Sequence, residues 1–181
     1  MTIVVKQQSR DRVALGFLNH EKINEALNLD LPLILAITIV GRTLIGFLID
    51  DRSSCNIIYT DTREQLGLQQ SYLNPYRDGY LLAFNESVTR PYRMIALTIS
   101  LGEKVHKRHV TFKFPVIPCK SAFKGIIGRS FLAKLDAVAS LVHLKLAYHD
   151  MEWKSTVVNV YLEEAMKIKG IVFKDILASS A

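Results

Sequence analysis

An aspartate that directly follows an apolar run is the feature of this sequence best suited to chemistry. Residues 47–49 are apolar, and they are followed by Asp50, Asp51, Arg52 and Ser53. A carboxylate placed there must leave the core, find polar partners or have its pKa raised by desolvation. Two such carboxylates can share a proton and activate a water molecule against a peptide carbonyl. The alternative interpretation of Asp50 is a loop acid that caps the next turn.

A second informative segment lies at residues 125–132. Gly125 is followed by two isoleucines, by Gly128 and by Arg129. In order and spacing, the two segments resemble the pattern of retropepsin-like aspartic proteases. In that pattern, an apolar run is followed by Asp, then by Thr or Ser, and then by Gly. Far downstream, two apolar residues are followed by Gly and, in retroelements, by Arg. The resemblance to the proteases of plant LTR retrotransposons covers residues 30–165.

This resemblance implies a homodimer, because the chain carries one acid motif of this kind and the site needs two carboxylates. Asp50 of each subunit would be catalytic, in an active-site loop that also contains Asp51, Arg52 and Ser53. The substrate would be an extended peptide of a retroelement polyprotein. The resemblance places the substrate flap at Ala83, Phe84 and Asn85, and the brace of the dimer and core at Ile127, Gly128 and Arg129.

The sequence departs from the family near the implied site. Asp51 stands where the family has Thr or Ser, and Arg52 stands where it has Gly. A second acid near a two-fold axis adds like charge, which Arg52 could neutralise, although the same side chain could obstruct substrate. Ala83, Asn85 and Arg93 replace glycines that a mobile flap uses. These departures keep open an alternative function, a non-catalytic retropepsin-like module for dimerisation or peptide binding.

Many short runs of apolar and β-branched residues predict a mostly β fold, closed or sandwiched, with two or three short helices. The resemblance implies that this fold is the closed β-barrel of the retropepsin-like, acid-protease type. The domain is expected at residues 31–150, between an N-terminal extension at 1–30 and a C-terminal strand and helix extension at 151–181. Strands are expected at 33–40, 43–49, 57–59, 81–84, 94–101, 109–115 and 137–148. Helices are expected at 61–68, where Asp61 would be the cap, at 130–135 and at 161–169, with a further short one at 21–29.

Composition narrows the classes of partner. The chain is 49% hydrophobic and 22% charged, an ordinary globular balance. Its net charge is +6, but the cations are scattered and no aromatic-rich motif accompanies them, so we do not expect a nucleic-acid partner. The apolar run at 31–40 has about half the ~20 residues of a membrane span, so we expect no membrane partner. The absence of targeting signals predicts a cytoplasmic location. No His/Cys spacing predicts a metal, and we expect no cofactor.

Overall fold

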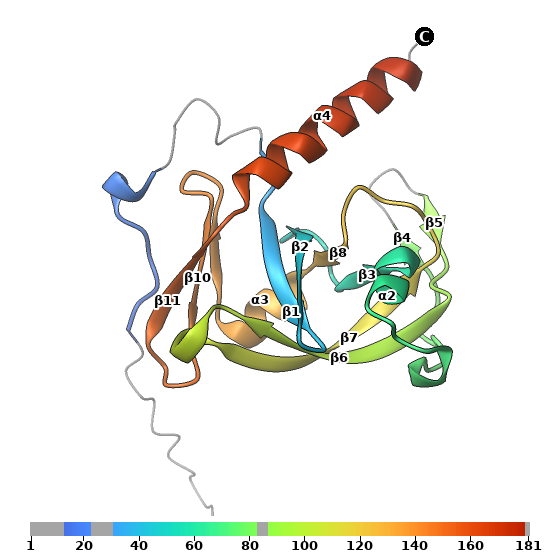
Figure 1. Ribbon diagram of the computed structural model, residues 1–181, viewed down its shortest axis with the longest axis horizontal. Coiled ribbons are helices and arrows are strands. Elements are labelled where there is room, and N and C mark those ends of the chain that lie inside the picture. The colour runs from blue at the N-terminus through green and yellow to red at the C-terminus, as the bar shows by residue number, and fades with distance from the viewer. Residues whose placement is uncertain (1–12, 23–30, 83–86, 180–181) are drawn as a thin grey trace, which may run out of the picture.

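The computed structural model describes residues 13–22, 31–82 and 87–179 (Figure 1). Its longest strands belong to two hairpins that pair with each other and with two short strands. These strands are β1 (Ile34–Ile39), β2 (Arg42–Ile49), β3 (Ile57–Tyr59), β6 (Arg93–Leu101), β7 (Arg108–Ile117) and β8 (Gly125–Ile127). They close into a barrel in the order β1-β2-β8-β3-β7-β6.

Two smaller sheets flank the barrel. A three-stranded sheet has the order β11-β10-β9, and a two-stranded ribbon pairs β4 with β5. Their strands are β9 (Val138–Ser140), β10 (Lys145–His149), β11 (Ser155–Asn159), β4 (Leu81–Leu82) and β5 (Val88–Thr89). Figure 1 shows the three-stranded sheet and the ribbon at opposite ends of the molecule, with the barrel between them.

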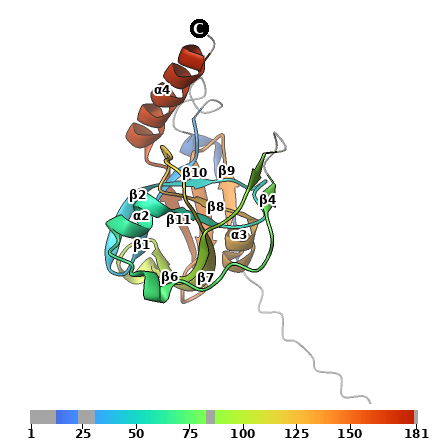
Figure 2. The ribbon, with the colours of Figure 1, turned by 90° about the vertical axis from the view of Figure 1, so that its right-hand side faces the viewer.

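Three α-helices lie in the described part of the chain: α2 (Thr60–Gln65), α3 (Arg129–Leu135) and α4 (Leu162–Ser179). Short 3₁₀ turns are η1 (Asn19–Glu21), η2 (Gln70–Tyr72) and η3 (Lys104–His106). In both views α4 projects away from the barrel (Figures 1 and 2). The predicted mostly β fold with a closed barrel is confirmed, although α4 is longer than predicted. None of the described helices combines the length and the apolarity that crossing a membrane requires.

The β1–β2 hairpin turns through Val40 and Gly41, whose φ angles are 50° and 73°. Positive φ at both central residues is the type I′ turn, whose twist matches that of a two-stranded ribbon. Further along, β2 carries one extra residue, Gly46, relative to β1. The side chains of Phe47 and Ile49 are buried after this bulge, so the hairpin ends with β2 anchored in the core directly before Asp50.

The barrel core is built from strand residues that alternate between buried and exposed positions. β6 and β7 pair in register over nine residue pairs, from Arg93 opposite Val116 to Leu101 opposite Arg108. Burying one large aliphatic or aromatic side chain is worth roughly 1.5–3 kcal/mol. The most completely buried side chains of the barrel include Ile34, Ile37, Phe47, Ile58, Ile95, Ile99, Phe114 and Ile127.

The three-stranded sheet and α4 are joined to the start of β1. The Tyr161 N–H donates to the Ile34 carbonyl at 2.9 Å, directly before α4 begins. α4 packs on β1 and β2 and buries Ala165 and Ile168 completely or nearly so. β10 and β11 pair along their whole length, from Lys145 opposite Asn159 onward. The predicted domain boundary at residue 150 stays a prediction.

Some predicted elements differ from the structure. The single strand expected at 137–148 is wrong, because the chain turns at 141–144 and Leu144 has a φ of 51°. The expected cap at Asp61 is also wrong: α2 begins at Thr60, its N-cap is Tyr59, and no side chain caps it. Most of the expected helix at 21–29 lies outside the described residues.

Candidate active site

β2 and β8 deliver Asp50 to the end of the barrel. The two strands run parallel, with Ile49 beside Ile127 at the last pair. The pairing continues one residue beyond β2, because the Asp50 N–H donates to the Ile127 carbonyl at 3.0 Å. Ile127 is completely buried, so the backbone of Asp50 is tied to the core while its side chain is half-buried.

The Asp50 carboxylate is oriented by its own loop. The Arg52 N–H donates to Asp50 Oδ1 at 2.9 Å, and the Ser53 N–H donates to the Asp50 carbonyl at 3.2 Å. This turn is an Asx turn, which fixes the side-chain rotation of an aspartate. Among the described residues, none donates a hydrogen bond to Oδ2. Asp51 and Arg52 are exposed at the tip of the loop.

The segment after β8 holds the other side of this loop. The Arg129 N–H donates to the Ser53 carbonyl at 2.9 Å, and Ser53 Oγ donates to the Cys55 carbonyl at 2.7 Å. Gly128 lies so close that a Cβ there would be 2.4 Å from the Cys55 carbonyl oxygen and 2.7 Å from that of Ser53. A glycine is therefore required, because the obstructing atoms belong to the backbone and cannot swing away.

Asn56 is a supporting residue that the sequence analysis missed. Its side chain is buried, and its Oδ1 accepts the Gly128 N–H at 2.9 Å. The amide thereby ties the start of β3 to the end of β8, directly beside the Asp50 loop. The position of a polar residue immediately before the apolar strand Ile57–Tyr59 was a signal of a supporting role. The sequence does not show, however, that Gly128 is the hydrogen-bond partner of Asn56.

The predicted site residues thus divide into three groups. Asp50 and Ser53 join the backbone of Arg129 in one hydrogen-bonded cluster, with Gly128 packed beneath them. The Arg129 side chain is exposed, and its role as a brace between two subunits stays a prediction. The predicted flap residues Ala83, Phe84 and Asn85 lie outside the described residues.

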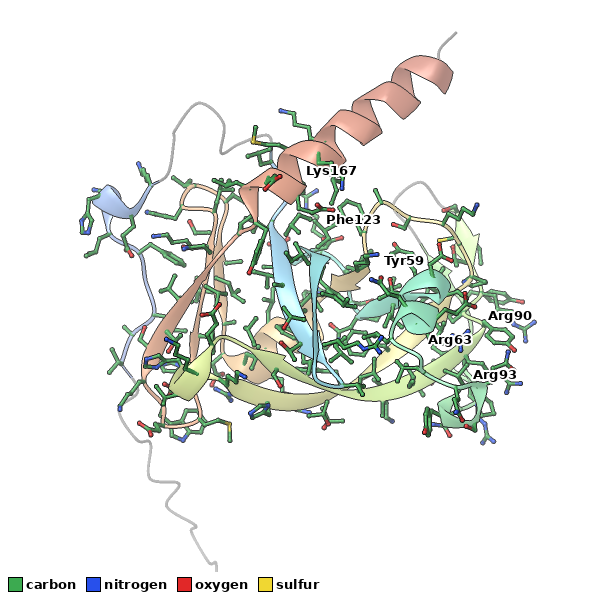
Figure 3. The ribbon with its side chains drawn as sticks, in the orientation of Figure 1. Tyr59, Arg63, Arg90, Arg93, Phe123 and Lys167 are labelled. Carbon is green, nitrogen blue, oxygen red and sulfur yellow. The ribbon has the colours of Figure 1, made fainter. Side chains whose placement is uncertain are left out.

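Two arginine–tyrosine contacts lie beside the ribbon that flanks residues 83–86. The Arg90 guanidinium lies 5.9 Å from the Tyr80 ring centroid, and that of Arg93 lies 5.5 Å from the Tyr92 ring centroid. Figure 3 shows Arg90 and Arg93 at one end of the molecule, away from the three-stranded sheet. Arg93 begins β6 and pairs with Val116, so it belongs to the barrel wall and not to the tip of the ribbon.

A second strand-end acid, Asp150, was also missed. Its side chain is 1% exposed, and its carboxylate accepts N–H groups of Glu152 and Lys154 and contacts His106 Nδ1 at 3.1 Å. The hydrogen bond from His106 and those from the backbone hold the pKa of Asp150 below its usual value. The neighbouring Tyr148 hydroxyl donates to the His106 carbonyl at 2.8 Å, and burial raises the pKa of Tyr148 to about 12.

Other chemistries find little support in the described residues. Across residues 13–22, 31–82 and 87–179, no three His, Cys, Asp or Glu side chains gather in a way that could hold a metal ion. Cys55 and Cys119 are not disulfide-bonded. Burial raises the pKa of the Cys55 thiol, which disfavours the thiolate that a cysteine nucleophile needs.

Two solved structures illustrate what the chain is similar to. The retroviral protease-like domain of Ddi1 from Leishmania major has 18% identity and a TM-score of 0.49, over 70% of this chain and 90% of that one. A retropepsin-like aspartic protease from Rickettsia conorii has 17% identity and a TM-score of 0.45, over 60% of this chain and 76% of that one. No family model and no curated protein matches the sequence. At these values no residue's role is carried over from either protein.

Proposed function

We propose that the chain is a retropepsin-type aspartic endopeptidase that acts as a homodimer. The observation that carries the proposal is the position of the Asp50 carboxylate. It is oriented by the Arg52 N–H in a loop that β8 and the Gly128–Arg129 segment hold in place. One such acid in each chain makes a pair when two copies meet about a two-fold axis.

In the proposed mechanism, Asp50 and Asp50 of the partner subunit share one proton and bind a water molecule between them. The ionised carboxylate takes a proton from the water as the water oxygen attacks the scissile carbonyl carbon. The protonated carboxyl group donates to the carbonyl oxygen, which gives a tetrahedral intermediate. Proton transfer to the amide nitrogen then releases the two products. The step consumes one water and uses neither a metal nor a cofactor.

The proposed substrate is an extended peptide that lies across the dimer seam, within a retroelement polyprotein of the cytoplasm. The β4–β5 ribbon beside the barrel supports the extended form of this substrate, because a two-stranded ribbon of this kind can fold over an extended chain.

A second candidate function is a non-catalytic module for dimerisation or peptide binding. The observation that favours it is the exposed pair Asp51 and Arg52 at the tip of the Asp50 loop. In a dimer, two further acids and two guanidinium groups would lie near the axis, where they could bind a peptide end or block the scissile bond.

Cleavage of a mixed peptide library from about pH 4 to about pH 7 tests the proposal, with Asp50→Asn as the control. The endopeptidase predicts cleavage that the substitution abolishes. A folded dimer that cleaves no peptide would reject the enzyme and favour the second candidate. The double variant Asp51→Thr with Arg52→Gly separates the two further: an impaired enzyme gains activity, whereas a remodelled binding module loses its partner.

A further inference from the structure

A groove of about 620 Å³ lies between the barrel and the three-stranded sheet, and none of the Asp50 loop residues lines it. This volume is within the range of about 300–1,000 Å³ that is usual for ligand sites. One wall is β11 and the other is β1 with the end of β6, while η3 and Lys107 close one end. In Figure 1 these two walls diverge from the junction of β1 with α4.

No strand of the described part of the chain pairs with the groove-facing edge of β11. The Asp150 N–H bonds to the Lys154 carbonyl, and the Val160 N–H bonds to the Leu144 carbonyl. Between those two bonds, β10 and β11 keep a regular antiparallel register. In such a register only every second residue of β11 forms backbone hydrogen bonds to β10. The even-numbered residues of β11 therefore bond to β10, whereas the N–H and carbonyl groups of Ser155, Val157 and Asn159 point away from it.

The β1 wall has a matching gap. The two-residue turn pairs Ile39 with Arg42, so the odd-numbered residues of β1 bond to β2. On the other edge, Thr38 pairs with β6 and the Ile34 carbonyl accepts the Tyr161 N–H. Ala36, which lies between them on the same edge, has no backbone partner in the described part of the chain. Among the described residues, the open edge of β11 and one unpaired residue of β1 thus face the same groove.

The end of the groove is held in place by contacts within the protein. The Tyr148 hydroxyl donates to the carbonyl of His106, and the His106 ring contacts the buried Asp150 carboxylate. Gly102 packs on the same tyrosine, because a Cβ there would overlap its hydroxyl oxygen. These contacts fix η3 to β10, and η3 carries two of the basic side chains at this end. A preformed wall lowers the entropy that a ligand must lose on binding.

The edge of β11 lacks the features that normally prevent strand addition. Its sequence, Ser155 to Asn159, contains neither charge, proline nor glycine, and Val157 is 39% exposed. In addition, Thr156 is one of the residues that line the groove, and its hydroxyl is buried and has no partner in the described part of the chain. The charged residues of the lining are Lys104, Lys107 and the single acid Glu103, with His106 beside them.

We propose that this groove binds an extended acidic peptide, which enters as an additional strand between β1 and β11. The peptide backbone bonds to Ala36 on one side and to Val157 and Asn159 on the other, as in other cases of strand addition. Its acidic side chains lie near Lys104 and Lys107. The chain direction of β1 runs away from the junction of β1 with α4, whereas that of β11 runs toward it. An inserted peptide is therefore parallel to one of these two strands and antiparallel to the other.

The test uses fluorescence anisotropy of a short labelled peptide of alternating glutamate and valine, with the full-length protein. The expected result is saturable binding that weakens at least about tenfold, or about 1.4 kcal/mol, when lysine replaces glutamate in the peptide. Lys104→Glu with Lys107→Glu should weaken the glutamate peptide similarly. The matched control is Lys113→Glu on β7, an exposed cation that does not line the groove. The same affinity for both peptides would overturn the acidic specificity.

Val157→Pro tests the strand edge, because it removes a groove-facing N–H while the bonds between β10 and β11 remain. We expect binding to weaken at least about tenfold with an unchanged melting temperature. If that variant misfolds, alternate N-methylation of the peptide tests the same hydrogen bonds on the ligand. Asp50→Asn should bind the peptide as the wild type does, which separates this groove from the proposed active site.

Three further results would overturn the proposal. The first is no binding of either peptide, and the second is binding that neither Val157→Pro nor N-methylation weakens. The third is a sedimentation profile in which the wild-type protein is a dimer that Val157→Pro converts to a monomer, without peptide binding. In that case a second copy of the chain, not a peptide, occupies the groove.

Discussion

Asp50 and Asp150 each end a strand in the same local turn, but the two acids have different surroundings. In both turns the N–H two residues on donates to the carboxylate, and the N–H three residues on donates to the main-chain carbonyl. The Asp150 carboxylate also accepts the Lys154 N–H and contacts His106, and Asp150 is 2% exposed. Asp50 is half-buried and keeps one carboxylate oxygen without a donor among the described residues. The surroundings, and not the turn, therefore decide which acid is available to a substrate.

The largest expected difference between these acids is catalytic. Asp50→Asn should lower kcat/KM for peptide cleavage by about 10³-fold, because a neutral amide cannot take the proton from water. Its stability should change by less than about 0.5 kcal/mol, since Asn Oδ1 can still accept the Arg52 N–H. The companion variant Asp150→Asn should keep kcat/KM within about threefold of wild type. Equal losses of activity in both variants would remove the functional distinction between the two turns.

Gly128→Ala should have the next largest effect, because it disturbs the packing that holds the Asp50 loop in place. The added Cβ meets backbone carbonyl oxygens of Cys55 and Ser53, so the loop or α3 must shift at a cost of about 1–3 kcal/mol. Chemical denaturation measures the loss, and cleavage should fall with it. The matched control is Gly16→Ala, where a Cβ meets nothing within 4 Å. Equal stability of the two variants would show that the loop tolerates displacement.

Asp150→Ala should destabilise the protein without acting on the Asp50 loop. It leaves the Glu152 and Lys154 N–H groups without their acceptor and releases His106 from the end of β10. We expect the melting temperature to fall by about 5 °C, whereas Asp50→Ala should lower it by less than about 2 °C. Thermal denaturation followed by circular dichroism measures both, and a reversed order would contradict the assignment of Asp150 as the structural clamp.

The smallest effect is the pH dependence of that clamp. The pKa of Asp150 is lowered in the folded protein, first by the hydrogen bond from His106 and then by backbone N–H groups. Its contribution to stability is therefore present above the ordinary value of 3.8 and is lost as the pH falls through the folded-state pKa. The difference in unfolding free energy between wild type and Asp150→Ala should shrink below pH 3.8. A difference that stays constant on acidification would contradict this linkage.

The mostly β character and the position of Asp50 at the end of a strand could be predicted from local patterns, whereas the closed barrel was implied by the family resemblance. An acid after an apolar run and the alternation of the strands can be recognised within a few residues. The Asn56–Gly128 bond joins residues 72 positions apart, and the His106–Asp150 contact joins residues 44 apart, so their partners could not be predicted. The division of residues 137–148 into β9 and β10 was also missed, because it depends on the backbone conformation of the turn between them. A left-handed backbone at Leu144 is not suggested by that residue type.

The groove between β1 and β11 was equally inaccessible to sequence reasoning. Its two edges come from Ala36 and Val157, which are ordinary strand residues in an ordinary composition. What distinguishes them is the register of neighbouring strands, which determines the edge from which each backbone group points. The predicted absence of a nucleic-acid partner stays a prediction.

Mixing wild-type protein with Asp50→Asn tests most directly whether the acids act as a pair across two chains. At constant total protein, after the subunits have exchanged, the account predicts peptide cleavage that falls with the square of the wild-type fraction. At equal amounts about one quarter of the original rate should remain, because mixed dimers hold one acid. Mixing with Asp150→Asn should leave the rate nearly unchanged. A rate that falls in direct proportion to the wild-type fraction would contradict the account, since each chain would then act alone.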